Sequence, residues 1–114
     1  MAIQIARVYD PPEDDGAARV LVDRLWPRGV AKADVHVDLW LKEIGPSTEL
    51  RTWFGHEPAK FEEFARRYRA ELDANPAVGR LRDLEREQGT VTLVYSAKDT
   101  EHNQAVVLRD YLTG

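Results

Sequence analysis

The chain has no cysteine and no long hydrophobic run, and these two absences narrow the classes of protein that it can represent. Without cysteine, disulfide bonds, thiolate nucleophiles and thiolate metal sites are excluded. No apolar stretch approaches the roughly 20 residues that a transmembrane helix requires. The first seven residues also lack the basic start and apolar middle of a secretory signal, which predicts a cytoplasmic protein without a membrane partner.

A surplus of basic residues is also missing. The 16 Lys and Arg residues against 20 Asp and Glu residues give a formal net charge of -4. Bulk nucleic-acid binding requires many cations that neutralise phosphates, so we do not expect it, although a small basic pocket remains compatible with an acidic surface. The histidines at 36, 56 and 102 have no metal-ligand spacing. We therefore expect no metal and no cofactor.

The pattern of β-rich and helical segments predicts one α/β domain over residues 1–114. Strands are predicted at 3–9, 18–25, 34–42 and 90–96, with a short helix around Trp40 as the alternative to the third strand, and a loop at 10–16. Helices are predicted at 48–54 with Ser47 as N-cap, from Pro58 to the Asn75-Pro76 pair, from there to about Gln88, and around 105–112. The sum is a three- to four-stranded, mostly parallel sheet flanked by helices.

The stretch from Val20 to Gly29 begins as a buried strand and ends in charged and aromatic residues. Strand alternation places Arg24 and Trp26 on one face and Asp23 on the other, so Asp23 and Arg24 cannot simply pair with each other. Each must find a partner elsewhere, because a charge beside a buried strand is costly unless it is paired or hydrogen-bonded. The carboxyl ends of strands are where α/β proteins bind ligands.

A second group of polar residues follows the strand at 90–96. Asp99 or Thr100 can cap the final helix, which would place Lys98, His102 and Asn103 in its first turn, where free N–H groups favour an anion. A histidine near a helix N-terminus tends to stay neutral and can act as a base. The alternative is an ordinary capped helix with a surface histidine.

If these two strands are neighbours, their carboxyl ends form one site for a phosphate or carboxylate, which Arg binds as a fork and Lys as a point charge. The alternative is that the arginines make ion pairs that tie loops to the sheet. The candidate ligand-binding residues are Arg24, Trp26, Arg28, Arg51, Lys98 and Asn103, and the candidate proton-transfer, or catalytic, residues are Asp23, Asp99 and His102.

Three groups of motifs run through the chain in order: RVLVDRLWPRG at 19–29; PS at 46–47 with ELR at 49–51 and WFGH at 53–56; and VTLVYSAKD at 91–99 with HN at 102–103 and AVVL at 105–108. Together they resemble the bacterial YeaO-like proteins of domain-of-unknown-function family 488. The resemblance implies a single YeaO-like domain but no reaction, because the family is named for lacking a known function. Larger relatives have an Asp-Val-Arg-type strand end, which corresponds to residues 22–24, and a Cys-His-Arg-type turn, where this chain has Glu101-His102-Asn103. The Cys and the Arg are absent here and only His102 carries over at that turn, so the resemblance implies no thiol chemistry for this chain.

We therefore expect a domain that binds a small anionic ligand, such as a nucleotide or another phosphate-bearing metabolite. One alternative is a non-catalytic module that uses Trp26, Trp53 and neighbouring loops to dock a protein partner or itself. A further alternative is a nucleoside- or nucleotide-processing enzyme. The residues leave the reaction, if there is one, and the oligomeric state open.

Overall fold

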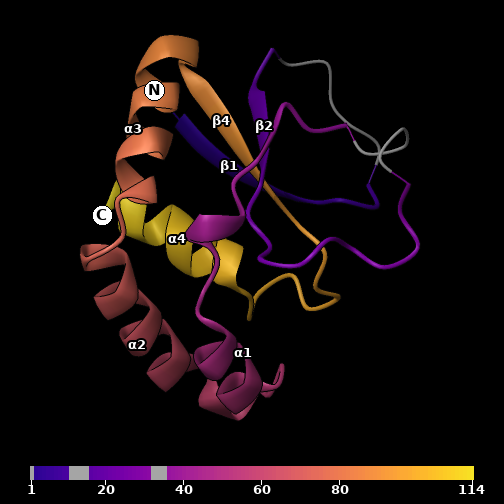
Figure 1. Cartoon of the computed structure of the whole chain (residues 1–114), viewed down its shortest axis with the longest axis vertical. Helices are drawn as coiled ribbons and strands as arrows, with labels where there is room; N and C mark the ends of the chain where they lie inside the picture. The colour runs from indigo at the N-terminus through magenta and orange to yellow at the C-terminus, as the bar shows by residue number, and fades with distance from the viewer. Residues whose placement is uncertain (1, 11–15, 32–35) are drawn as a thin grey trace.

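The protein, described here from a computed structural model at residues 2–10, 16–31 and 36–114, contains a parallel four-stranded sheet. The spatial order of its strands is β1-β4-β2-β3 (Figure 1). The predicted α/β class is confirmed. Residues 11–15 of the predicted loop and 34–35 of the predicted third strand lie outside the described residues. The strands are β1 (Ala2–Arg7), β2 (Ala18–Leu21), β3 (Leu39–Trp40) and β4 (Thr90–Tyr95), and all three pairings are parallel.

The second and third strands are shorter than the sequence predicts. Val22 still donates a hydrogen bond to the carbonyl of Val94, but the amide of Ser96, the first residue after β4, donates to the side chain of Asp23 instead of to backbone. The backbone ladder therefore stops before residue 25. Strand β3 keeps two residues, and the chain then turns into a 3-10 helix at Lys42–Ile44, so the helical alternative applies just after Trp40.

Four α-helices follow the predicted plan: α1 (Thr48–Phe54), α2 (Phe61–Asp73), α3 (Ala77–Gln88) and α4 (Gln104–Thr113). Ser47 caps α1 as predicted, because its Oγ accepts a hydrogen bond from the amide of Leu50 at 3.2 Å. Gly55 ends that helix with a φ of 53°, a left-handed conformation that glycine adopts at little cost. Helix α2 begins later than predicted, because Pro58–Lys60 forms a 3-10 turn before it.

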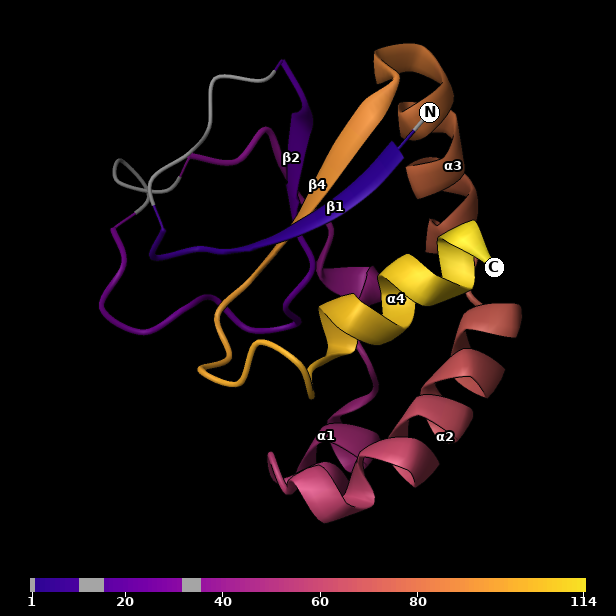
Figure 2. The same cartoon turned by 180° about the vertical axis from the view of Figure 1, so that it is seen from behind.

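One hydrophobic core joins the sheet to all four helices. Alternate residues of β2 and β4, among them Val20, Val91 and Leu93, are fully buried in it. Residues 22–31 run on the side of the molecule away from α2 and α3, as Figures 1 and 2 both show. None of the helices in the described residues has the length and apolar character needed to cross a membrane.

Candidate functional site

A cleft lies where β2 and β4 end. The two strands are parallel neighbours, so the condition on which the predicted site depended is met. The cleft has a volume of about 870 Å³, within the range typical of small-molecule sites. Its walls come from six places in the chain: Tyr9 after β1, residues 23–28 after β2, residues of α1 with its flanks, Phe64 of α2, residues 96–99 after β4, and Gln104 at the start of α4.

Seven of the nine predicted site residues line this cleft, and two do not. The two outside it are His102 and Asn103. The seven that line it are Asp23, Arg24, Trp26, Arg28, Arg51, Lys98 and Asp99.

Three basic side chains line the cleft and make no side-chain hydrogen bond or ion pair with another described residue. Arg28 follows β2, Arg51 lies on α1 and Lys98 follows β4. No side-chain hydrogen bond or ion pair joins any of the three to another residue within 2–10, 16–31 or 36–114. Arg51 does interact electrostatically with Asp23 across the cleft. The three cations therefore remain available to an anion.

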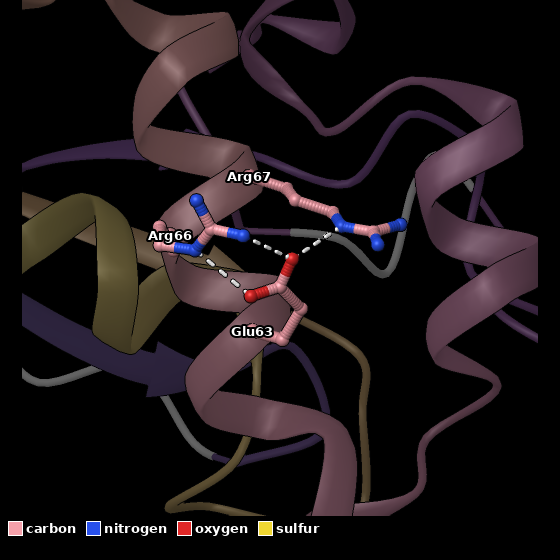
Figure 3. Close-up of polar contacts among 3 residues, drawn as sticks. All are labelled: Glu63, Arg66 and Arg67. Atoms are coloured by element: carbon pink, nitrogen blue, oxygen red, sulfur yellow. Dashed lines mark hydrogen bonds and ion pairs between the residues drawn. The ribbon is translucent and has the colours of Figure 1, made fainter.

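One basic cluster elsewhere on the surface, on α2, is neutralised by an acidic neighbour. On α2, Glu63 accepts hydrogen bonds from Arg66 at 2.6 and 2.8 Å and from Arg67 at 2.8 Å (Figure 3). These hydrogen bonds, from Arg66 first and Arg67 second, lower the pKa of Glu63 to about 2. Arg28, Arg51 and Lys98 have no such acidic partner among the described residues, and they line one cleft together.

Arg24 lines the cleft but is already engaged. Its Nε donates to the carbonyl of Pro46 at 2.8 Å, and its Nη2 donates to the carbonyl of Gly45 at 2.7 Å. Arg24 thus ties the end of β2 to the segment before α1, as the structural alternative for the arginines predicted, although through carbonyl groups and not through an ion pair. Asp23 and Arg24 have separate partners, as strand alternation predicted.

Asp23 is the buried polar group of the cleft, with 8% of its surface exposed. Its Oδ2 accepts hydrogen bonds from the amide and the hydroxyl of Ser96, and its Oδ1 accepts one from the side chain of Gln104. Burial raises the pKa of Asp23 above its ordinary value, while the bonds from Ser96 and Gln104 and the charge of Arg51 oppose that rise. Asp23 is therefore a buried carboxyl group at the cleft whose two oxygens both accept hydrogen bonds from the protein.

The turn after β4 differs from the prediction. Asn103, not Asp99 or Thr100, caps α4: its backbone is extended and its Oδ1 accepts from the amide of Val106 at 3.0 Å. Asp99 instead closes the preceding turn, because its Oδ1 accepts from the amides of Glu101 and His102 at 2.9 Å each. These bonds lower the pKa of Asp99. Lys98 and His102 consequently precede the helix and do not lie in its first turn.

His102 and Asn103 have contacts of their own outside the cleft. The Nδ1 of His102 lies 2.9 Å from Oδ2 of Asp99, and its ring meets Phe61 edge-on with centroids 5.2 Å apart. Asn103 is buried and donates to the carbonyl of Asp99 at 2.8 Å. Both residues thus organise the turn that presents Lys98.

The tryptophans are partly buried and internally bonded. Trp26 and Trp40 meet edge to face, and their indole N–H groups donate to the carbonyls of Val30 and Asp23, respectively. The guanidinium carbon of Arg67 lies over the Trp53 ring, 4.3 Å from the ring centre. The large hydrophobic side chains that are exposed among the described residues are Tyr9 at 49% and Leu25 at 60%.

Sequence reasoning missed Ser96, Gln104 and His56 as residues of the cleft. Ser96 could have been found, because it follows the central strand directly and strand ends carry ligand sites. His56 has a φ of 58°, unusual for a residue other than glycine, and it follows Gly55, which ends α1. Gln104 gives no local signal. No cluster of His, Asp and Glu that could hold a metal ion occurs in the part of the chain that the structure describes.

Comparisons with known proteins place the chain in a family. The Uncharacterized protein YeaO of Escherichia coli strain K12 is 50% identical over 113 residues, which cover 98% of this chain and 97% of that protein. The Uncharacterized proteins Mb3100c of Mycobacterium bovis and Rv3073c of Mycobacterium tuberculosis are each 42% identical over 112 residues, which cover 98% of this chain and 94% of theirs. No solved structure matches the chain significantly. The family model described as "Inactive DUF488-N3 subclade" matches residues 2–114, and the chain therefore belongs to that family.

Proposed function

We propose that the chain binds a small phosphate-bearing metabolite or nucleotide in the cleft at the ends of β2 and β4. The observation that carries the proposal is the convergence of Arg28, Arg51 and Lys98 from three separate segments, with no side-chain hydrogen bond or ion pair from any of them to another described residue. Three like charges that share a concave site repel one another, and a bound anion would remove that repulsion.

The remaining lining gives such a ligand further contacts. Asp23, Ser96 and Gln104 offer hydrogen-bonding groups on one wall. Tyr9 and Leu25 offer exposed apolar surface beside them. Sites for small molecules combine apolar walls with a few polar groups in this way. A ligand with an anionic end and a less polar body would match this lining better than a bare inorganic ion.

Binding is better supported than turnover. His102, a candidate base, lies outside the cleft and bonds to Asp99. Asp23 lines the cleft, but donors from Ser96 and Gln104 already occupy its two oxygens. The description of the matched family as an inactive subclade agrees with a domain that binds without catalysing a reaction.

Thermal unfolding in the presence of anions tests the proposal. Inorganic phosphate, pyrophosphate, AMP and citrate are each added in large excess, with adenosine as the uncharged probe. A ligand that binds only the folded state at about a hundred times its Kd raises the free energy of unfolding by about 2.7 kcal/mol. We expect pyrophosphate or AMP to raise the Tm by several degrees and adenosine to leave it unchanged, since the phosphate provides the attraction.

Matched substitutions assign that effect to the cleft. Arg51→Gln and Lys98→Gln each remove a cation from the cleft, whereas Arg66→Gln removes one that Glu63 already neutralises. The first two should reduce the Tm shift caused by pyrophosphate, and Arg66→Gln should preserve it. The proposal fails if none of the anions stabilises the protein, or if the two cleft variants respond as strongly as the wild type.

A further inference from the structure

Five consecutive residues before α1 each have a backbone group held by a side chain from elsewhere in the chain. They form the segment from Glu43 to Ser47, which leads out of the 3-10 helix and into α1. The carbonyl of Glu43 is held by Asn75, that of Ile44 by Tyr68, those of Gly45 and Pro46 by Arg24, and the amide of Ser47 by Glu71. Four side chains therefore fix the path by which the chain enters α1.

Glu71, on α2, holds the last residue of this segment with both carboxylate oxygens. The amide of Ser47 donates to Oε1 at 2.9 Å, and the hydroxyl of Ser47 donates to Oε2 at 2.6 Å. The same hydroxyl oxygen accepts from the amide of Leu50, so Glu71 fixes the N-cap of α1. Hydrogen bonds to an ionised acceptor are stronger than neutral ones, and a negative charge near a helix N-terminus is favourable.

Arg24 holds the segment from the side of the sheet. The backbones approach closely there: a Cβ atom on Gly45 would lie 3.0 Å from the amide nitrogen of Arg24 and 3.3 Å from the carbonyl oxygen of Val22. The segment therefore lies directly against the end of β2. With Arg24 on one side and Glu71 on the other, its position relative to the cleft is set by α2 and β2 together.

Arg51 depends on this arrangement through the helix that carries it. The amide of Arg51 donates to the carbonyl of Ser47 at 2.9 Å, so the two residues share the first turn of α1. Helix α1 has seven residues, and helices of that length are marginal without tertiary contacts. The direction of the Arg51 side chain into the cleft is therefore tied to the residues that hold Ser47.

We propose that Glu71 is a positioning residue for the anion-binding cleft, acting through Ser47 to hold α1 where Arg51 lines the site. Glu71 is not among the residues that line the cleft. The inference rests on the proposed function and extends it to a residue on another helix. The inference also predicts a change in anion affinity opposite to the change that the charge of Glu71 alone would cause. Removal of an acidic side chain by charge alone strengthens the binding of an anion, whereas loss of positioning weakens it.

A double-mutant cycle measured by calorimetry with pyrophosphate tests the inference. The four proteins are wild type, Arg51→Gln, Glu71→Ala and the double variant, at a temperature well below unfolding. Arg51→Gln should weaken binding by about tenfold or more, the effect of one charge-assisted hydrogen bond. Glu71→Ala should also weaken it, and the double variant should bind no more weakly than Arg51→Gln alone, because Glu71 acts through Arg51.

Two further variants complete the comparison. Glu62→Ala removes the same charge from the same helix at an exposed position and should leave affinity unchanged or slightly higher. Glu71→Gln keeps one acceptor for Ser47 and should restore part of the affinity lost in Glu71→Ala; if Glu71→Ala does not fold, Glu71→Gln takes its place in the cycle. Pyrophosphate affinity at or above that of wild type in the Glu71 variants, with Arg51→Gln weakened, overturns the positioning role and leaves the proposed function intact. An Arg51→Gln affinity equal to that of wild type also overturns the positioning role, and the proposed function fails with it if Lys98→Gln binds equally well. Absence of anion binding to the wild type overturns both proposals.

Discussion

Asp23 and Ser96 follow neighbouring parallel strands and are joined by two hydrogen bonds to a single carboxylate oxygen. The amide of Ser96 donates to Oδ2 of Asp23 at 3.0 Å, and the hydroxyl of Ser96 donates to the same atom. The side chain of Asp23 thus continues the contact between β2 and β4 beyond the end of their backbone ladder. This contact places the carboxyl group of Asp23 in a buried position, and burial raises its pKa.

The first prediction concerns the pH dependence of stability at Asp23. A folded-state pKa above the ordinary value of 3.8 means that the folded protein holds this proton more tightly than the unfolded chain does. The free energy of unfolding therefore falls as the pH rises from the unfolded pKa to the folded pKa, and the loss is complete above the latter. Asp23→Asn cannot ionise, so its stability relative to wild type should increase over that pH interval.

Urea unfolding of the two proteins across a series of pH values from acid to neutral measures this difference. Glu62→Gln, which alters an exposed acid, serves as the control and should show no comparable rise relative to wild type. A stability difference between Asp23→Asn and wild type that stays constant, or that moves in the opposite direction, would show that the donors from Ser96 and Gln104 outweigh burial.

The second prediction concerns the buried hydroxyl of Tyr68. This hydroxyl donates to the carbonyl of Ile44 at 2.6 Å, and the side chain is completely buried. Tyr68→Phe leaves that carbonyl without its donor and should lower the free energy of unfolding by about 1–3 kcal/mol. Tyr111→Phe removes an exposed hydrogen bond to Asp73 and should cost less. Equal losses in the two variants by chemical denaturation would contradict this account.

The third prediction compares two glycines with opposite outcomes. A methyl group at Gly45 meets backbone atoms of Val22 and Arg24 at 3.0–3.3 Å, so Gly45→Ala should destabilise the protein by about 1–3 kcal/mol. Gly79 lies in α3 with open space where its Cβ would be, so Gly79→Ala should stabilise it by about 0.5–1 kcal/mol. Thermal unfolding of both variants measures the signs. A Tm for Gly45→Ala at or above that of wild type would refute the close approach.

The fourth prediction concerns Glu63, whose pKa of about 2 lies below its ordinary value of 4.5 because Arg66 and Arg67 hydrogen-bond to it. A lowered folded pKa contributes stability above the unfolded value, and this contribution is lost as the pH falls from 4.5 towards 2. An NMR titration of the Glu63 carboxyl carbon should therefore show a depressed midpoint. At about 1 M salt, where the Debye length is about 3 Å, the midpoint should rise. A midpoint that is already ordinary at low salt would contradict the geometry in Figure 3.

The sequence patterns predicted which segments form the sheet better than they predicted where each strand ends. The β-rich runs that contain Val20 and Leu93 identified neighbouring strands, because buried parallel strands leave a strong apolar signature. The third strand was overestimated, since alternation at 34–42 does not reveal that the chain turns into a 3-10 helix after Leu41. The number of paired residues depends on the neighbouring strand, which a local pattern does not contain.

Local sequence patterns also did not predict the hydrogen-bond partner of each polar side chain. Asp99 and Asn103 are both good helix caps, and only the folded turn, in which the amide of His102 bonds to Asp99, leaves the cap to Asn103. Arg24 and Arg51 were equivalent cations in the sequence. Their difference arises because carbonyls of a distant segment use Arg24.

The position of β4 in the middle of the sheet has a consequence for how the protein is made. Strand β1 pairs only with β4 among the described strands, residue Ala2 against Thr90 and Arg7 against Tyr95. During synthesis β1 therefore has no partner among the described strands until residues 90–95 have left the ribosome, and β2 meets only the two residues of β3 before then. Such long-range pairing slows folding and keeps the early segments exposed, so the nascent chain depends on the last strand to complete its core.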